Sequence, residues 1–129
     1  IAGGGGGIPV IRNEKGVRHG IQAVIDKDLT SAHIGNVLGI DVLMILTAVP
    51  KVCINFGTPE QRELDRVTLK EIKEFYALGQ FPPGSMGPKI DAAIKFLEGG
   101  GKHVIIADLE EAMPALHGKT GTHIVCDNG

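Results

Sequence analysis

The sequence lacks the long apolar and basic segments that direct proteins to membranes or nucleic acids. Its longest apolar stretch, VLMILTAV, is too short to cross a bilayer, and no basic segment followed by an apolar one opens the chain. Thirteen Lys and Arg residues stand against fifteen Asp and Glu residues, and the basic ones are spread rather than gathered into runs. We therefore expect no membrane partner and no nucleic-acid partner.

Cysteine is also scarce. The two cysteines, Cys53 and Cys126, are far apart and lie in the apolar stretches VCINF and HIVCD. Buried free thiols are common in such surroundings, and free thiols are typical of a reducing compartment. We expect a cytoplasmic protein without a disulfide.

Standard catalytic and metal-binding motifs are missing. The pattern G-x-G-x-x-G would need glycine where Ile8 stands, and the pattern G-x-x-x-x-G-K-[ST] does not occur. The histidines show no helical pairing and no Cys-x-x-Cys partner, so no metal site built from protein ligands alone is predicted. No serine stands in a G-x-S-x-G turn, which leaves covalent catalysis unsupported.

What is present indicates one α/β domain. The chain has 129 residues, 43% of them hydrophobic, which is enough for one sizeable core. Continuous apolar runs of strand length, DVLMILT and HVIIA, are typical of strands covered on both faces, and THIVCD reads as a final strand. Because such strands alternate with helical patterns, the sequence predicts a layered fold with a largely parallel sheet.

The helix boundaries can be predicted from capping residues. We expect a helix over residues 29–38 with Asp28 as N-cap and Gly39 at its end, and a second one after the capping box of Thr68 and Glu71. A third should begin with Pro88 in its first position. Shorter features are an extended IPVIRN, turns at NEKG and RHG, an apolar strand at IQAVI, an extended arm at KVCINFG and at most a short helix before Pro114.

Glycine is abundant, and five of the 19 glycines are consecutive, from Gly3 to Gly7. Only Ile1 and Ala2 precede them, which is short for a strand feeding a glycine-rich turn. We therefore expect the chain to be part of a longer protein. Glycines allow the backbone to approach an anion closely, although a flexible turn would explain the same run.

Two lysines occupy positions suited to phosphate. Lys27 stands between Asp26 and Asp28 where the IQAVI strand gives way to a helix, and Asp28 could both cap the helix and orient a lysine. In FPPGSMGPK, Lys89 arrives in the first turn of a helix, where N–H groups and the helix dipole favour an anion. A solvated turn and an exposed lysine remain the alternative readings. Phe56 and Phe81 lie in loops and could contact a base.

Taken in order, GGGGGIPVI, AVIDKDLTSA, DVLMILTAVPKVCINFGTPE, QFPPGSMGPKIDAAIKFLEGG and KTGTHIV resemble the carbamate kinases of the amino acid kinase superfamily. The resemblance implies a three-layer αβα sandwich with a mainly parallel sheet. It also implies reversible phosphoryl transfer between ATP plus carbamate and ADP plus carbamoyl phosphate. Residues 1–129 would form the single C-terminal, nucleotide-binding lobe, without the N-terminal lobe that holds the acid substrate, and would be inactive alone.

The same resemblance assigns site residues. Lys27, Asp28 and Lys89 would be catalytic, with ATP or ADP as the nucleotide and Mg²⁺ held through its phosphates. The full-length protein would be a homodimer. The other expected nucleotide-binding residues are Gly5, Gly6, Asp26, Thr47, Val49, Val52, Asn55, Phe81, Gly84, Ser85 and Met86. Alternatives left open are a kinase of the same superfamily acting on acetylglutamate or a nucleoside monophosphate, a nucleotide-binding module without catalysis, and a purely structural domain.

Overall fold

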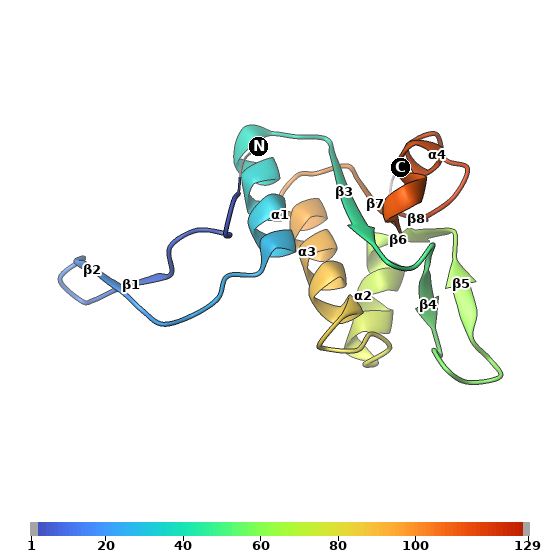
Figure 1. Cartoon of the computed structure of the whole chain (residues 1–129), viewed down its shortest axis with the longest axis horizontal. Coiled ribbons are helices and arrows are strands. Elements are labelled where there is room, and N and C mark those ends of the chain that lie inside the picture. Colours follow the sequence, from blue (N-terminus) through green and yellow to red (C-terminus); the bar gives the residue numbers. More distant parts are fainter. Residues whose placement is uncertain (1–2, 128–129) are drawn as a thin grey trace.

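The computed structural model describes residues 3–127 and is built around a mixed four-stranded sheet (Figure 1). The strand order is β3 (Val42–Thr47), β7 (His103–Asp108), β8 (Thr122–Val125), β6 (Arg66–Thr68). The β3–β7 and β8–β6 pairings are parallel, whereas β7 and β8 run antiparallel. The predicted α/β class is confirmed, and two of the three pairings in this sheet are parallel.

The helices cover the two faces of the sheet unequally. Three helices pack on one face, α1 (Lys27–Leu38), α2 (Leu69–Ala77) and α3 (Met86–Glu98), while a short 3-10 turn (Leu109–Glu111) and α4 (Ala112–Leu116) lie on the other (Figure 1). The larger core contains the fully buried Phe96, Ile106 and Ile124, and the smaller one contains Ile105, Ala107 and Ala115. This gives three layers, the third of which is small.

Helices α1 and α3 run parallel and in close contact. Asp28 meets Lys89 near their first turns, and the Asn36 side chain donates to the Lys95 carbonyl near their last turns at 3.0 Å. A Cβ on Gly35 would lie 2.7 Å from Phe96 Cε2, so only glycine permits this approach. The packing therefore sets the N-terminal ends of two helices side by side.

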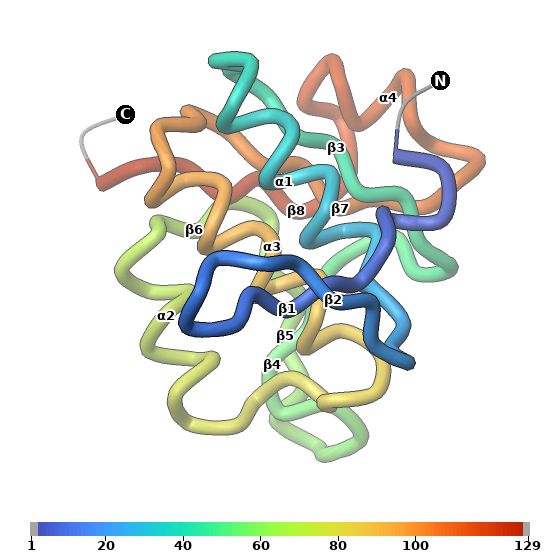
Figure 2. The backbone as a smooth tube through the Cα atoms, turned by 90° about the vertical axis from the view of Figure 1, so that its left-hand side faces the viewer, coloured from blue at the N-terminus to red at the C-terminus, as the bar shows by residue number. Residues whose placement is uncertain are grey.

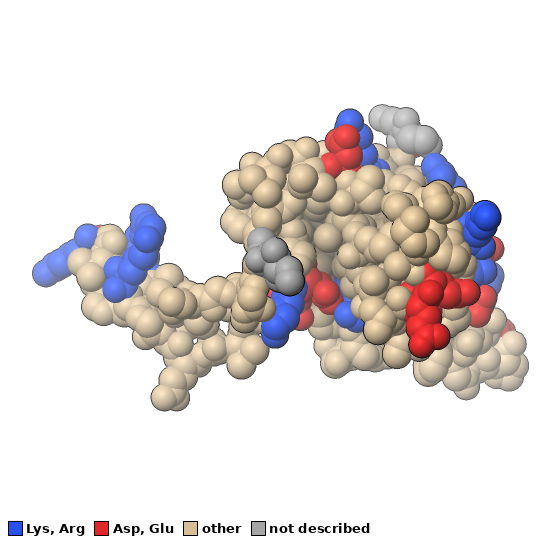
Figure 3. Space-filling view, turned by 45° about the horizontal axis from the view of Figure 1, so that its top comes forward, with Lys and Arg blue, Asp and Glu red and all other residues tan. Residues whose placement is uncertain are grey.

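Two hairpins extend from this body. The first, β1 (Val10–Arg12) with β2 (Arg18–Gly20), forms an arm that projects in front of α1 and α3 in Figure 2, with Lys and Arg side chains at its outer end (Figure 3). Its turn is fixed by Asn13, whose side chain accepts from the Lys15 and Val17 N–H groups. The second hairpin, β4 (Val52–Ile54) with β5 (Arg62–Leu64), confirms the extended arm predicted at KVCINFG.

Several local predictions were wrong for reasons of tertiary context. RHG forms β2 rather than a turn because it pairs with β1. IQAVI is not a strand: Val24 is 92% exposed, and this segment leads from the arm to α1 without a partner strand. Strand β3 is covered on both faces, but incompletely: Leu43 and Ile45 pack in the larger core and Met44 and Leu46 against the smaller one, while only Ile45 is buried.

Helix ends were predicted more closely. Gly39 adopts the expected left-handed conformation with φ 66°, and the capping box of Thr68 and Glu71 is present. Helix α3 begins at Met86, so Pro88 is its third residue rather than its first, where the missing N–H is still harmless. Pro114 likewise lies inside the first turn of α4 instead of ending it.

Candidate functional site

An ion pair joins the two adjacent helix ends. Lys89 Nζ lies 2.9 Å from Asp28 Oδ2, and both side chains are about three-quarters buried, with exposures of 23% and 27%. Lys27 is the first residue of α1 and is exposed beside this pair. Two ammonium groups and the positive ends of two helix dipoles therefore lie close together, with Asp26 and Asp28 as counter-charges, and helix N-terminal ends with a lysine beside them can bind phosphate.

Asp26, and not Asp28, is the N-cap of α1. Its Oδ1 accepts from the Leu29 N–H at 2.9 Å, so the predicted cap is displaced by two residues. This shift has a consequence for the site. Because Asp26 satisfies the helix end, the Asp28 carboxylate remains available to hold Lys89.

The first turn of α3 offers fewer free N–H groups than its sequence suggests. The Gly87 N–H donates to the Pro82 carbonyl at 2.8 Å, and Pro88 has no N–H. A Cβ on Gly87 would approach the Pro82 oxygen to 2.9 Å, which explains the glycine. Attraction of an anion to this helix end therefore falls chiefly to the Lys89 ammonium.

The glycine run packs against the start of α1. The Gly6 carbonyl accepts from Thr30 Oγ1 at 3.0 Å, and a Cβ on Gly6 would lie 3.0 Å from the Ile25 oxygen. Gly5 and Gly6 border a separate shallow hollow together with Thr30 and Ile34. The run thus lies next to the helix that carries Lys27 and Asp28.

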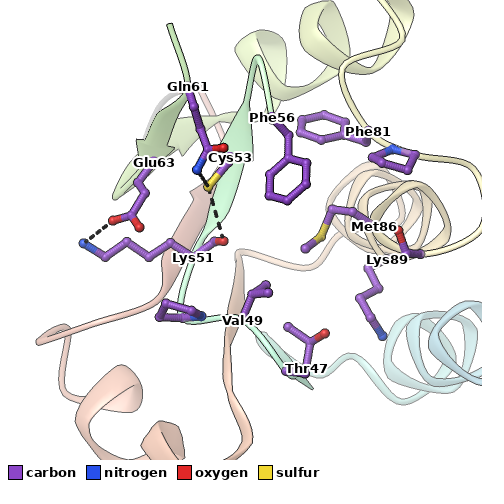
Figure 4. Close-up of a pocket in the computed structure, with 14 residues that line it drawn as sticks. Thr47, Val49, Lys51, Cys53, Phe56, Gln61, Glu63, Phe81, Met86 and Lys89 are labelled. Atoms are coloured by element: carbon purple, nitrogen blue, oxygen red, sulfur yellow. Dashed lines mark hydrogen bonds and ion pairs between the residues drawn. The ribbon is translucent and has the colours of Figure 1, made fainter. Parts of the chain in front are cut away.

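A cavity of about 440 Å³ opens beyond the carboxyl end of β3 and reaches Lys89 (Figure 4). Three segments form its wall: the chain that leaves β3, the β4–β5 hairpin, and the loop that leads into α3. The lining residues are Thr47, Ala48, Val49, Pro50, Lys51, Cys53, Phe56, Gln61, Glu63, Phe81, Pro82, Ser85, Met86 and Lys89. The carboxyl end of a parallel strand is where ligands commonly bind in open α/β sheets.

Apolar side chains line the middle of this cavity. Phe56, Phe81, Val49 and Met86 border it, with Lys89 at one end of the set (Figure 4). Phe56 is 69% exposed on the hairpin loop, whereas Phe81 is 6% exposed and belongs to the core. An apolar slot that ends at a lysine suits a ligand with a flat apolar part and an anionic part, such as a nucleotide.

The end of the cavity away from Lys89 is polar. Lys51 Nζ lies 2.6 Å from Asp65 Oδ1 and 3.7 Å from Glu63 Oε2, and the bond to Asp65 raises the pKa of Lys51. Burial raises the pKa of the Cys53 thiol, and the nearby Glu63 carboxylate raises it further. Cys53 is therefore held as the neutral thiol.

Gln61 and Glu63 were not predicted as site residues. Gln61 Oε1 accepts from the Gly57 N–H at 2.9 Å, and its Nε2 lies 3.9 Å from Cys53 Sγ. Both side chains reach the cavity because β5 pairs with β4. Their stretch, GTPEQREL, carries no local pattern that indicates a site.

The predicted site residues divide into groups. The structure brings Thr47, Val49, Phe81, Ser85, Met86 and Lys89 to the cavity wall. Val52 lies in the core with its side chain fully buried, and Asn55 adopts φ 53° and donates its N–H to Gln80 Oε1. The predicted residues that do not border the cavity are Gly5, Gly6, Asp26, Lys27, Asp28 and Gly84.

The described residues form neither a metal-binding cluster nor a membrane-spanning helix. Among residues 3–127, no three His, Cys, Asp or Glu side chains are arranged to hold a metal ion. None of the helices in the described part of the chain is long and apolar enough to cross a membrane.

Comparisons with known proteins agree on one group. The model of the amino acid kinase family matches residues 4–108. The chain is 51% identical to the carbamate kinase-like protein YahI of Escherichia coli (strain K12) over 125 residues, covering 97% of this chain and 40% of that protein. It is 50% identical to the carbamate kinase of Thermococcus kodakarensis, covering 97% of this chain and 39% of that enzyme.

A solved structure has the same fold. Carbamate kinase from Giardia lamblia bound to AMP-PNP matches with a TM-score of 0.87 and 48% identity, covering 95% of this chain and 39% of that one. The chain therefore spans about 40% of the length of the curated relatives that it matches.

Proposed function

The chain belongs to the amino acid kinase family, and we propose that it is the nucleotide-binding part of a carbamate kinase. In this proposal the longer protein transfers a phosphoryl group reversibly between ATP plus carbamate and ADP plus carbamoyl phosphate. One observation carries it: the Lys89–Asp28 ion pair joins the adjacent N-terminal ends of α3 and α1, and Lys89 also borders the 440 Å³ cavity.

The nucleotide would occupy the cavity with its base among the apolar side chains. Phe56, Val49 and Met86 would contact the base, and the phosphates would extend toward Lys89. Phosphoryl transfer asks a protein chiefly for positioning and positive charge. In this proposal Lys89 and Lys27 supply the charge, and Asp28 fixes the direction in which Lys89 points.

Mg²⁺ would bind through the nucleotide phosphates and neutralise part of their charge. Gly5 and Gly6 would lie near the transferred group, because they pack against the start of α1.

The acid substrate would bind mainly outside this chain. The chain corresponds to about 40% of the relatives' length, and we assign carbamate recognition to the remaining part of the longer protein. A homodimer of that protein and a cytoplasmic location belong to the same proposal and rest on the similarity to carbamate kinases.

The test uses the full-length protein. Formation of ADP from ATP in the presence of carbamate, and of ATP from ADP and carbamoyl phosphate, is the expected result. Transfer to acetylglutamate or a nucleoside monophosphate, with no transfer to carbamate, would reject carbamate as the substrate. Nucleotide binding without any transfer would show that the protein is a nucleotide-binding module without catalysis.

A variant test accompanies this assay. Lys27→Ala should raise the activation free energy of turnover by about 2.7–4 kcal/mol, which is the cost of losing one hydrogen-bond donor to the transition state. Lys102→Ala is the control, because Lys102 is a 72% exposed partner of Asp41 outside the cavity. Equal turnover in the two variants would show that Lys27 does not take part in phosphoryl transfer.

A further inference from the structure

A second hollow shares the lining residue Lys51 with the large cavity. It has a volume of about 280 Å³ and is formed where β6 and β8 begin and by the turn at residues 118–121. Lys51, Arg66 and Lys119 line it, together with Asp65, Thr120 and His123. We refer to it as the basic hollow. Lys51 borders both the basic hollow and the large cavity.

The charged side chains that line the basic hollow are mostly cationic. It has three cationic side chains and one carboxylate, and that carboxylate, Asp65, lies 2.6 Å from Lys51 Nζ. Within residues 3–127, neither Arg66 nor Lys119 has a carboxylate oxygen within 4 Å. The whole chain carries a formal charge of −2. Two further carboxylates, Glu63 and Glu111, contact the lining residues Lys51 and Thr120 from outside the hollow. In the described part of the chain, Arg66 and Lys119 are therefore the cations of the hollow without a carboxylate partner, which favours an anion bound between them.

The rim of the basic hollow is fixed by hydrogen bonds. His123 Nε2 lies 3.0 Å from the Thr120 carbonyl, and His123 Nδ1 lies 3.0 Å from His103 Nε2. Because a carbonyl can only accept, Nε2 of His123 carries the proton, and Nδ1 accepts from His103 when His123 is neutral. Burial lowers the pKa of His103, with smaller contributions from His123 and Arg66.

Hydrogen bonds to residues outside the turn at 118–121 hold it in place. Thr120 Oγ1 donates to Glu111 Oε2 at 3.1 Å, and the His123 N–H donates to the Asp65 carbonyl at 2.8 Å. The turn and the start of β6 are thus kept in place before any ligand arrives. A fixed rim reduces the ordering cost of binding.

We propose that the basic hollow binds a small oxyanion of the phosphate class between Arg66 and Lys119, and that Lys51 couples this anion to the nucleotide cavity. Arg66 and Lys119 supply charge-assisted hydrogen bonds, and Arg66 can do so with two N–H groups at once. The binding of the anion is independent of the proposed function, whereas the coupling rests on it.

The coupling follows from the two partners of Lys51. Its ammonium lies between Asp65 of the basic hollow and Glu63 of the large cavity. A bound oxyanion attracts the ammonium and leaves the Glu63 carboxylate less neutralised in the cavity wall. It also adds negative charge near the site of a polyanionic nucleotide. Both effects weaken nucleotide binding, and by linkage the nucleotide weakens anion binding by the same factor.

The first experiment measures anion binding by the full-length protein. Potassium phosphate is titrated at constant ionic strength while the imidazole resonances of His123 are followed by NMR. The variant Arg66→Gln/Lys119→Gln should bind phosphate at least about 10-fold more weakly than the wild type, because two charged donors are lost. The control Lys15→Gln/Arg18→Gln removes the same charge from the distant β1–β2 arm and should change nothing.

The second experiment measures coupling. Saturating phosphate should raise the dissociation constant of ADP about 2- to 5-fold in the wild type, the range expected for partly exposed charges. The effect should vanish in Arg66→Gln/Lys119→Gln. An effect that persists in this variant would mean that phosphate competes directly at the nucleotide site, and the coupling would be rejected.

Failure of this inference and failure of the proposed function can be told apart. Equal phosphate affinity in the wild type and Arg66→Gln/Lys119→Gln, or a His123 resonance that does not respond, would overturn the anion site whatever the nucleotide does. A protein that binds phosphate at the basic hollow but does not bind ADP would overturn the coupling and the proposed function, and would leave the anion site standing.

Discussion

Lys89 and Asp28 lie 61 positions apart in the sequence, yet Lys89 Nζ is 2.9 Å from Asp28 Oδ2. They belong to the first turns of α3 and α1, and the parallel packing of these helices creates the contact. The direction in which Lys89 points therefore depends on how α1 and α3 pack against each other. In the proposed function, Asp28 is a positioning residue for the Lys89 charge at the end of the cavity.

Asp28→Asn in the full-length protein should lower kcat while leaving KM for ATP unchanged or slightly lower. The variant keeps a positive Lys89 and removes a negative charge, so ground-state binding of phosphate is retained. The ammonium loses its fixed direction, and misplacement of this kind can cost about 10- to 100-fold in rate. Steady-state kinetics with ATP varied at saturating carbamate measure the two constants separately.

Asp91→Asn is the matched control for that change. Asp91 forms a comparable 2.7 Å ion pair with Lys95, also on α3, but it lies outside the cavity. Its kinetics should equal those of the wild type. If Asp28→Asn raises KM and spares kcat, the positioning role is wrong.

Phe56→Ala should weaken nucleotide binding without unfolding the protein. Phe56 is 69% exposed and borders the cavity, so its ring can contact a base at little cost to the core. Loss of one stacked aromatic ring typically costs about 1–3 kcal/mol per base. Calorimetric titration with ADP measures the loss. Phe81→Ala provides the contrast: this buried residue should instead lower the free energy of unfolding by about 3–5 kcal/mol.

Leu78→Ala controls for exposure alone, because Leu78 is 73% exposed and does not border the cavity. It should bind ADP like the wild type. The same affinity in Phe56→Ala and Leu78→Ala would show that the base does not contact Phe56.

Cys53 should react slowly with iodoacetamide at neutral pH and faster as the pH rises. The raised pKa of its thiol keeps the reactive thiolate scarce near neutrality. A nucleotide in the cavity should slow the reaction further, whereas Cys126, outside the cavity, should be indifferent to nucleotide. Peptide mass spectrometry resolves the two sites. Equal protection of both cysteines would point to a global change instead of occupation of the cavity.

The capping box at α2 should make stability depend on pH in the acidic range. Glu71 accepts from the N–H and the Oγ1 of Thr68, and these bonds lower the pKa of Glu71. A lowered folded-state pKa means that the contribution is present at neutral pH and disappears as the pH falls through that pKa. Thr68→Ala should cost about 0.5–2 kcal/mol at neutral pH.

Thermal unfolding of the wild type and Glu71→Gln, followed by circular dichroism, tests the pH dependence. The difference in melting temperature should be present at neutral pH and shrink on acidification. A difference that stays constant with pH would assign the effect to packing. Glu74→Gln, on the same helix and outside the capping box, is the control.

Local signals predicted local structure well. The capping box of Thr68 and Glu71 and the left-handed Gly39 depend on neighbours within four positions, and the structure confirms both. The IQAVI segment has a strand-like composition but no strand beside it, and its prediction failed for that reason. The direction of β8 relative to β7 is likewise a property of the pairing, which apolar patterning does not encode.

Some residues of the candidate site could likewise be predicted from the local sequence, and others could not. FPPGSMGPK is a short loop with distinctive chemistry, and it places Phe81, Ser85, Met86 and Lys89 at the cavity. Gln61 and Glu63 were missed because they reach the cavity only through the pairing of β5 with β4. Asp28 was expected to cap its helix and orient a lysine, and the structure gives the cap to Asp26.

The sequence by itself determined the α/β class, the end of α1 at Gly39, the start of α2 at Thr68 and the segments rich in glycine and lysine, because these depend on side-chain periodicity and on contacts between near neighbours. Only the tertiary structure decided that Lys89 lies against Asp28, that Phe56 and Phe81 border one cavity, and that Lys51 borders two hollows. Each of these relationships joins residues brought together by helix packing or strand pairing. The reason is physical: a side chain's neighbours across a sheet or between helices are set by the burial of the whole core, and no local stretch of sequence contains that information.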